Sequence, residues 1–167
     1  ERRQITVMFC DIVGSTELSA RLDPEELTEL YQGYRAATEE VILSFEGYIA
    51  EYLGDGIVAY FGYPQAQENA AERSVRAALA TIEALKTAHL SAPGEEEGLS
   101  VRIGIATGLV VAGELLGATE EAQVRTVVGE TPNLAARLQG LATPNSIVIG
   151  ENTRALLGNL FTLEALP

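Results

Sequence analysis

The hydrophobic pattern of the first 47 residues predicts a buried strand followed by a long helix. Residues 5–10 are apolar at nearly every position and β-prone, which is typical of a strand covered on both faces. Asp23, Pro24 and Glu26 form a helix-start signal, in which Asp23 caps the helix and Glu26 completes a capping box. Apolar residues then recur at helical spacing until Gly47 stops the helix, at Leu27, Leu30, Tyr31, Tyr34, Val41 and Phe45.

Two short strands and a second helix are expected next. The strands lie near residues 47–53 and 57–61, and Asp55 between two glycines marks a hairpin turn that joins them. The helix is expected over residues 67–90, and a solvated loop follows over residues 91–98. The buried stripe of this helix is predicted at Val75, Leu79, Ile82 and Leu85.

The C-terminal half carries weaker signals that complete the fold. A strand signal over residues 99–112 is interrupted by Gly104 and Gly108, and residues 113–123 resemble a flexible connection. The β-α-β-β-α-β order with additions is that of the split βαβ, or ferredoxin-like, fold of the α+β class. The remaining elements are a strand over 124–128, a helix that opens at Thr131 and carries Leu134, Leu138 and Leu141, a strand over 146–149, a short helix, and an edge strand near 160–163.

Composition narrows the functional classes. The 167 residues are enough for one domain with a hydrophobic core, and we expect a single domain over residues 1–167, excised from a longer chain because it starts without methionine. The net charge of −13 argues against nucleic acid or an anionic membrane as a partner, because both bind basic patches. The single cysteine, Cys10, is expected to be a buried apolar residue in a reducing, cytoplasmic compartment. No apolar run reaches the roughly 18 residues of a membrane helix.

Two aspartates in tight glycine settings carry the first chemical signal. Asp11 ends the first apolar run and opens a turn into a helix, and Asp55 sits in the predicted hairpin. In a β-α-β-β order the end of the first strand can lie next to that hairpin, so the two carboxylates can share ions. The backbone N–H groups of Gly14, Ser15 and Thr16 can then face phosphate oxygens at the start of the helix.

Three further polar residues lie in otherwise apolar elements. Asn133 and Arg137 are four residues apart on one helix and project from the same face, where an amide beside a guanidinium suits an anionic transition state. Taken alone, they also fit a solvent-facing arginine and an ordinary first-turn asparagine. Arg102 lies in an apolar strand, where it fits either a phosphate ligand or an edge-strand arginine.

Taken together, these segments resemble the catalytic domain of the class III nucleotidyl cyclases. The resemblance runs from Val7 to about Ile149 and includes features of bacterial members. Four motifs at matching spacing carry it: FCDIVGST at 9–16, YLGDG at 52–56, VRIGIATG at 101–108 and VVGETPNLAARLQ at 127–139.

The resemblance implies a two-metal-ion cyclisation. Asp11, Asp55 and the Ile12 carbonyl would hold two divalent cations, Mg²⁺ or Mn²⁺. The ribose 3′-oxygen would attack the α-phosphorus, and pyrophosphate would leave.

The resemblance also implies a site shared between two subunits. Arg137 would stabilise charge on the α-phosphate, Asn133 would orient the ribose, and Arg102 would hold the distal phosphates. In the family the metal aspartates come from one subunit and the Asn/Arg helix from the other. The implied active form is therefore a head-to-tail homodimer with two sites at its interface.

Two positions select the base in this family. Glu51 stands where similar adenylate cyclases carry lysine and where guanylate cyclases carry glutamate. An ionised carboxylate only accepts hydrogen bonds, so it pairs with the N1–H and N2–H₂ donors of guanine and not with adenine N1. Thr126, at the second position, fits either base and is familiar in bacterial adenylate cyclases. We therefore expect GTP as the favoured substrate, with ATP in an atypical base pocket as the alternative.

Two other classes compete with this interpretation. A diguanylate cyclase shares the core fold but carries a Gly-Gly-Asp/Glu-Glu-Phe hairpin, whereas the hairpin of this chain reads LGDGI. A non-catalytic nucleotide-sensing or dimerisation module is expected to lose a metal aspartate or the Asn/Arg pair. Asp11, Asp55, Asn133 and Arg137 are all present, so a cyclase is favoured over either class.

Overall fold

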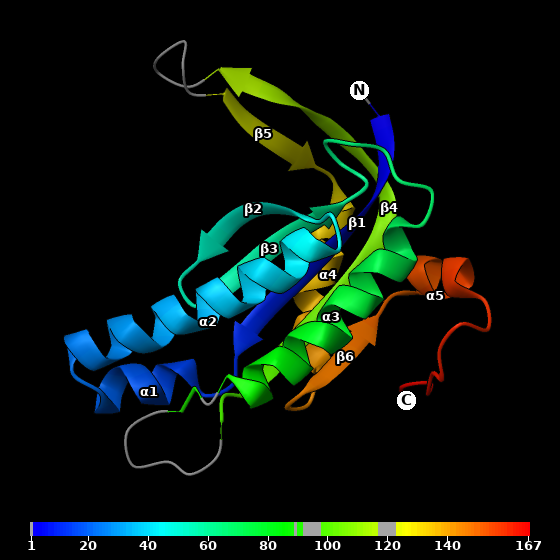
Figure 1. Cartoon of the computed structure of the whole chain (residues 1–167). Helices are drawn as coiled ribbons and strands as arrows, with labels where there is room; N and C mark the ends of the chain where they lie inside the picture. Colours follow the sequence, from blue (N-terminus) through cyan, green and yellow to red (C-terminus); the bar gives the residue numbers. More distant parts are fainter. Residues whose placement is uncertain (1, 89, 92–97, 117–122) are drawn as a thin grey trace.

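The computed structural model describes residues 2–88, 90–91, 98–116 and 123–167, with backbone alone for 113–116 and 123–128. The helices and strands follow one another along the chain in nearly the predicted order (Figure 1). In order they are β1 (Arg2–Ile12), α1 (Ser15–Arg21), α2 (Pro24–Ser44), β2 (Tyr48–Leu53), β3 (Gly56–Phe61), α3 (Ala70–Thr87), β4 (Val101–Leu116), β5 (Gln123–Val128), α4 (Glu130–Leu141), β6 (Ser146–Ile149) and α5 (Glu151–Leu157).

The sheet confirms the split βαβ arrangement with additions. Its strand order is β2-β3-β1-β4-β5, and β6 pairs with β4 in parallel. The strand β1 is antiparallel to both β3 and β4, so it occupies the centre of the sheet. Among the described residues, no helix is long and apolar enough to cross a lipid bilayer.

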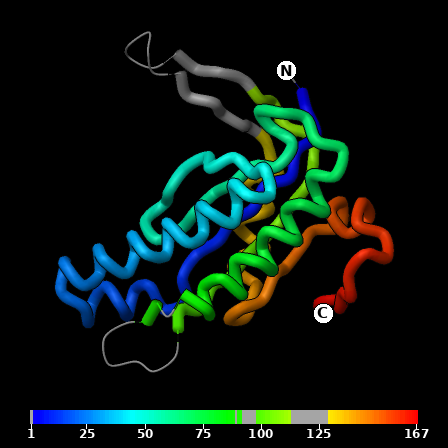
Figure 2. The backbone as a smooth tube through the Cα atoms, in the orientation of Figure 1, coloured from blue at the N-terminus to red at the C-terminus, as the bar shows by residue number. Residues whose placement is uncertain are grey.

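Helices cover both faces of this sheet, which explains why β1 is apolar at successive positions. The helices α2 and α3 lie side by side across one face, and α4 packs on the other against β4 and β1 (Figure 1 and Figure 2). Met8 and Cys10 belong to the core under α2 and α3. Val7 belongs to the core under α4, and Phe9 packs against that same core. Alternate residues of β1 therefore enter two different cores.

The start of α2 is the predicted capping box. The Asp23 carboxylate accepts a hydrogen bond from the Glu26 backbone N–H at 2.9 Å, and the Glu26 carboxylate accepts one from the Asp23 N–H at 3.2 Å. Pro24 occupies the first turn, where no backbone N–H is needed. The local sequence was therefore sufficient to predict where this helix begins.

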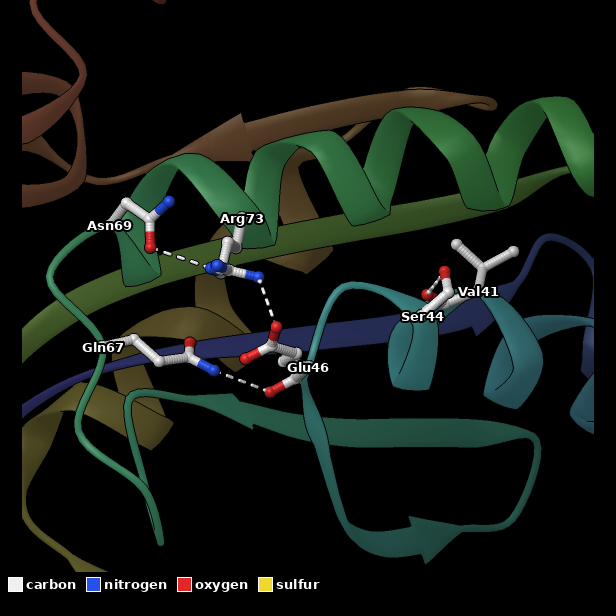
Figure 3. A network of polar contacts seen from close by, with 6 residues as sticks. All are labelled: Val41, Ser44, Glu46, Gln67, Asn69 and Arg73. Carbon is white, nitrogen blue, oxygen red and sulfur yellow. Dashed lines mark hydrogen bonds and ion pairs between the residues drawn. The ribbon is translucent and has the colours of Figure 1, made fainter.

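A polar network joins the end of α2 to the start of α3 (Figure 3). The Gln67 amide donates to the Glu46 carbonyl at 2.9 Å, and Arg73 contacts both the Asn69 side chain at 2.8 Å and the Glu46 carboxylate at 3.3 Å. Gln67 and Asn69 lie before α3, because this helix begins at Ala70 and ends at Thr87. The predicted helix over residues 67–90 was too long at both ends.

The structure differs from the sequence prediction at three further places. Leu79 is 49% exposed because the buried stripe of α3 passes through small residues such as Ala71 and Ala78. Residues 160–163 form no strand; instead, the Phe161 ring packs against the core beneath α2 and α3 and under the Arg76 guanidinium. Part of the predicted flexible connection over 113–123 is strand, because β4 continues to Leu116 and pairs with β5.

Two glycines of β4 allow α4 to lie directly on the sheet. A Cβ atom on Gly104 would stand 2.2 Å from the Gln139 backbone nitrogen and 2.3 Å from the Ala135 carbonyl oxygen, and one on Gly108 would stand 2.6 Å from Thr131 Oγ1. Neither glycine interrupts the strand, contrary to the sequence prediction. The buried face of α4 is made of Thr131 and Ala135, whereas Leu141 at the end of this helix is 63% exposed.

We predict that Gly104→Ala destabilises the fold by about 3 kcal/mol, the upper end of ordinary overpacking costs. The added methyl group meets backbone atoms of α4, which cannot rotate away as a side chain can. Gly140→Ala is the matched control, because nothing lies within 4 Å of its added Cβ. In a helix that change is expected to stabilise by about 0.5–1 kcal/mol. Urea unfolding measures both, and equal effects would contradict the close contact at Gly104.

Candidate active site

Asp11 and Asp55 meet at the end of β1, as expected. Asp55 lies in the turn between β2 and β3, and its Oδ2 accepts a hydrogen bond from the Ile12 backbone N–H at 3.0 Å. This bond joins the hairpin turn directly to the residue that follows Asp11. The two aspartates come from parts of the chain 44 residues apart, and the pairing of β1 with β3 brings them together.

Both aspartates line a cavity of about 220 Å³ on the α4 face of the sheet. Apolar side chains of β1, β2 and β3 form part of its wall, and α4 closes one side. The lining residues are Phe9, Cys10, Asp11, Leu53, Asp55, Gly56, Val58, Ala136 and Gln139.

The electrostatics of the cavity favour a cation. Burial and the neighbouring Asp55 carboxylate raise the pKa of Asp11, and the charge of Arg102 and a hydrogen bond from Gln139 act in the opposite direction. Two carboxylates that repel each other in a partly buried site are stabilised by a divalent cation between them.

Cys10 is a structural residue, as the sequence predicted. Its side chain is 1% exposed, and burial raises the pKa of its thiol to about 12. The Tyr34 hydroxyl donates to the Cys10 carbonyl at 3.3 Å and lies 3.4 Å from its sulfur. A thiol with so little thiolate character is a poor nucleophile.

The donor set fits a hard divalent cation. The Asp55 carboxylate and the Asp11 carboxylate each use one oxygen in a hydrogen bond, with Ile12 N–H and the Gln139 amide respectively. Since the Ile12 N–H points toward Asp55, the Ile12 carbonyl of the extended strand points to the same side. No group of three or more His, Cys, Asp and Glu residues that could hold a metal ion by itself occurs in the described part of the chain. Two carboxylates and a carbonyl suit Mg²⁺, which keeps water and phosphate oxygens as its other ligands.

The segment after Asp11 turns sharply into α1. Gly14 adopts a left-handed conformation with φ of 74°, which an L residue with a side chain rarely adopts, and α1 begins at the next residue. Among the described residues, no side chain caps α1, so no capping group from them competes for the backbone N–H groups of Gly14, Ser15 and Thr16.

A β-bulge directs Glu51 toward the α4 face. Ile49 pairs with Ala59, but the register shifts by one, and Glu51 pairs with Val58, which lines the cavity. The Glu51 side chain is exposed, and its charge contributes, after burial, to the raised pKa of Tyr60 on the same face. Without the bulge, Glu51 would point toward α2.

Thr126, the second position expected to select the base, is placed only by its backbone. It lies in β5 opposite Gly113, and its side chain falls outside the described residues.

Arg102 lies beside the aspartates. It is directly opposite Asp11 in the β1–β4 ladder, so both side chains project on the α4 face. Strands flank Arg102 on both sides, because β4 also pairs with β6 at Ser146. The edge-strand interpretation of this arginine is therefore wrong. Its Nε is buried and has no hydrogen-bond partner among the described residues.

The structure does not bring Asn133 and Arg137 to this cavity. Both side chains are exposed on α4, on the side turned away from the sheet, whereas Ala136 and Gln139 of the same helix line the cavity. Asn133 and Arg137 lie on the same face of α4, as predicted, but within one chain that face points away from Asp11.

Two residues near the aspartates were not recognised in the sequence. Gln139 donates from Nε2 to Asp11 Oδ1 at 2.7 Å. Arg35 of α2 donates to the Gly54 carbonyl at 2.6 Å and lies over the Tyr52 ring at 4.5 Å, which supports the turn that carries Asp55. A signal for Gln139 was present, since it is a polar residue one helical turn after Ala135 on the sheet-facing side of α4.

Comparisons with known proteins identify the family of this chain. The family model described as adenylate and guanylate cyclase catalytic domain matches residues 1–166. Adenylate cyclase 1 of Rhizobium meliloti is 36% identical over 142 residues, which cover 84% of this chain and 21% of that protein. The chain spans between 15% and 27% of the length of three curated relatives.

Two solved structures share both the fold and a third of the sequence. The guanylyl cyclase Cya2 superposes with a TM-score of 0.87 at 33% identity, covering 95% of this chain and 80% of that one. The adenylyl cyclase CyaB from P. aeruginosa superposes with a TM-score of 0.84 at 31% identity, covering 94% and 81%. The chain therefore belongs to the class III adenylate and guanylate cyclase catalytic domain family.

Proposed function

We propose that this domain converts a purine nucleoside triphosphate into its 3′,5′-cyclic monophosphate and pyrophosphate, with GTP as the favoured substrate. The observation that carries the proposal is the convergence of Asp11 and Asp55 on one cavity at the end of β1. A cytoplasmic location and a single domain over residues 1–167 remain predictions from the sequence.

The residues of this chain divide the chemistry among them. Asp11, Asp55 and the Ile12 carbonyl would hold two divalent cations, Mg²⁺ or Mn²⁺. When bound, such ions lower the pKa of the ribose 3′-hydroxyl and neutralise the triphosphate. The 3′-oxygen loses its proton to solvent and forms a bond to the α-phosphorus. The bond from that phosphorus to the bridging oxygen breaks, and pyrophosphate leaves.

Positive charge and backbone donors would hold the phosphates. Arg102 supports this role because its buried Nε has no hydrogen-bond partner among the described residues. A bound phosphate oxygen would satisfy that donor, which is otherwise costly to bury. The backbone N–H groups of Gly14, Ser15 and Thr16 supply further donors at the start of α1.

A second copy of the chain would complete each site. The cavity of about 220 Å³ is smaller than the roughly 300–1,000 Å³ of small-molecule sites. Asn133 and Arg137 are exposed on the outer side of α4, where they can reach the nucleotide held by a partner. We therefore propose a homodimer in which Asn133 orients the ribose and Arg137 stabilises the α-phosphate of the partner's substrate.

Glu51 is the basis for favouring GTP. Its position opposite Val58 supports a role at the edge of the cavity. The solved relatives do not decide the base, because the guanylyl cyclase Cya2 and the adenylyl cyclase CyaB are similar to this chain to nearly the same degree. Conversion of ATP to cyclic AMP therefore remains the alternative.

Turnover of GTP and ATP, each with Mn²⁺ and with Mg²⁺, tests the function directly. Chromatography separates cyclic GMP from cyclic AMP, and we expect metal-dependent formation of cyclic GMP in excess. Predominant cyclic AMP would show that Glu51 does not select guanine in this domain. Absence of both products, in protein that is dimeric and folded, would overturn the proposal.

Complementation tests the shared site. We predict that Asp55→Ala and Arg137→Ala are each inactive alone but restore about a quarter of wild-type activity when co-expressed. Half of randomly formed dimers pair the two variants, and each such dimer has one intact site of two. Co-expression of Asp11→Ala with Asp55→Ala is the control and should restore nothing, because both changes affect the same half-site. Failure of the first pair to complement would contradict the shared site.

A further inference from the structure

The Gln139 side chain donates a hydrogen bond to the Asp11 carboxylate. Among the described residues, no other side chain does so. The Gln139 Nε2 lies 2.7 Å from Asp11 Oδ1, and the contact is partly buried. An ionised carboxylate is an acceptor only, so the amide nitrogen, and not the amide oxygen, must face it. The bond joins α4 to β1 across 128 residues of sequence.

The backbone of α4 determines where this amide can reach. Gly104 of β4 leaves room for α4 to approach until the Gln139 backbone nitrogen lies 2.2 Å from the position that a Cβ atom would occupy. Ala135, one helical turn earlier, is fully buried against the sheet. The Gln139 side chain therefore starts from a backbone that is packed on β4 directly beside the β1 strand.

The two aspartates are held in the same way. Asp11 Oδ1 accepts from Gln139, and Asp55 Oδ2 accepts from Ile12 N–H. No other hydrogen bond from a described residue reaches either carboxylate. Each aspartate thus has one oxygen fixed by the protein and one oxygen left for a ligand.

From this geometry we propose that Gln139 is a positioning residue of the metal site, which orients the Asp11 carboxylate so that its second oxygen faces the cation. The proposal rests on the proposed function, because it requires that Asp11 binds a divalent metal. Groups that hydrogen-bond to metal ligands commonly contribute about 10–100-fold to metal affinity. Loss of the Gln139 donor is expected to weaken metal binding by about tenfold.

The test is Mn²⁺ binding by the protein without nucleotide, measured as free Mn²⁺ by electron paramagnetic resonance. Gln139→Met removes the donor but keeps side-chain volume and helix propensity. Gln67→Met is the matched control, because Gln67 also donates an amide hydrogen bond, to the Glu46 carbonyl far from Asp11 in the sequence. Gln139→Asn is a second variant, which keeps the amide but is one methylene too short to reach Asp11 from a backbone held at Gly104.

We expect about tenfold weaker Mn²⁺ binding for Gln139→Met and Gln139→Asn, and unchanged binding for Gln67→Met. Turnover should show the same pattern. In both Gln139 variants the half-saturating Mn²⁺ concentration should rise by a larger factor than kcat falls, and in Gln67→Met neither should change. A purely structural role would lower the unfolding midpoint without this selective shift in metal dependence.

Two results would overturn the inference, and they are distinguishable. If the wild-type protein binds Mn²⁺, Asp11→Asn abolishes binding and both Gln139 variants bind as wild type, the inference alone is wrong. If the wild-type protein binds no Mn²⁺ with or without GTP, the proposed metal site is wrong as well.

Discussion

Asp55→Asn is expected to lower cyclic nucleotide formation by at least about 100-fold. Loss of a group that only hydrogen-bonds to a metal ligand already costs up to about 100-fold, and Asp55 is expected to bind the metal directly. Asparagine has the same shape, and its carbonyl oxygen can still accept the hydrogen bond from Ile12 N–H. The other carboxylate oxygen is replaced by the amide NH₂ group, which is a hydrogen-bond donor and does not bind a cation. The fold should therefore survive while the metal site is lost.

Asp23→Asn is the matched control for this change. Asp23 is the N-cap of α2, where asparagine caps as well as aspartate does, so stability and turnover should be unchanged. Initial rates over a range of Mn²⁺ concentrations, together with thermal unfolding, measure both effects. Activity of Asp55→Asn within about threefold of wild type would contradict a metal role for Asp55, since the loss of a direct ligand is expected to cost far more.

Glu51→Lys is expected to shift the ratio of GTP to ATP turnover toward ATP by about tenfold or more. Residue 51 is exposed in the free chain, and a bound base would cover it. A donor or acceptor that is then buried and left unpaired costs about 1–3 kcal/mol, and each 1.4 kcal/mol corresponds to a factor of ten. Lysine donates to adenine N1 but meets the N1–H donor of guanine with like polarity. Because the bulge places residue 51 opposite Val58 at the cavity wall, the new ammonium group should reach the same region as the carboxylate.

Glu40→Lys changes the net charge by the same amount on the exposed side of α2 and should leave the ratio unaltered. The ratio of kcat/KM for GTP and ATP, measured in Mn²⁺ and Mg²⁺, is the quantity to compare. An unchanged ratio in folded Glu51→Lys protein would show that the base is selected elsewhere, with Thr126 as the next position to replace.

Local signals were sufficient to predict the helices and strands and their order, apart from the strand expected near residues 160–163. The apolar run of β1, the capping box at Asp23 and the hairpin glycines around Asp55 act over a few residues, so they can be interpreted without the rest of the chain. The order of those elements then limited the topology to the split βαβ sheet, and the sheet brought Asp11 beside Asp55 as expected. The four motifs also predicted the family, which the family model and the solved relatives confirm.

Close contacts between distant segments could not be predicted from those signals. Gly104 and Gly108 appeared to interrupt a strand, but their function is to admit α4, and only the packed helix reveals it. The face of Glu51 depends on a one-residue bulge, since a shift of one position moves a side chain to the opposite side of a sheet.

The sequence by itself therefore determined most of the helices and strands, the fold class and the choice of the two aspartates as candidates, because these follow from short-range periodicity and local backbone preference. The tertiary structure decided which side chains share the Asp11 cavity: Gln139 enters it, while Asn133 and Arg137 on the same helix face away. The physical reason is that a helix presents each residue at a different angle, and only contact with β4 fixes which angle faces the sheet.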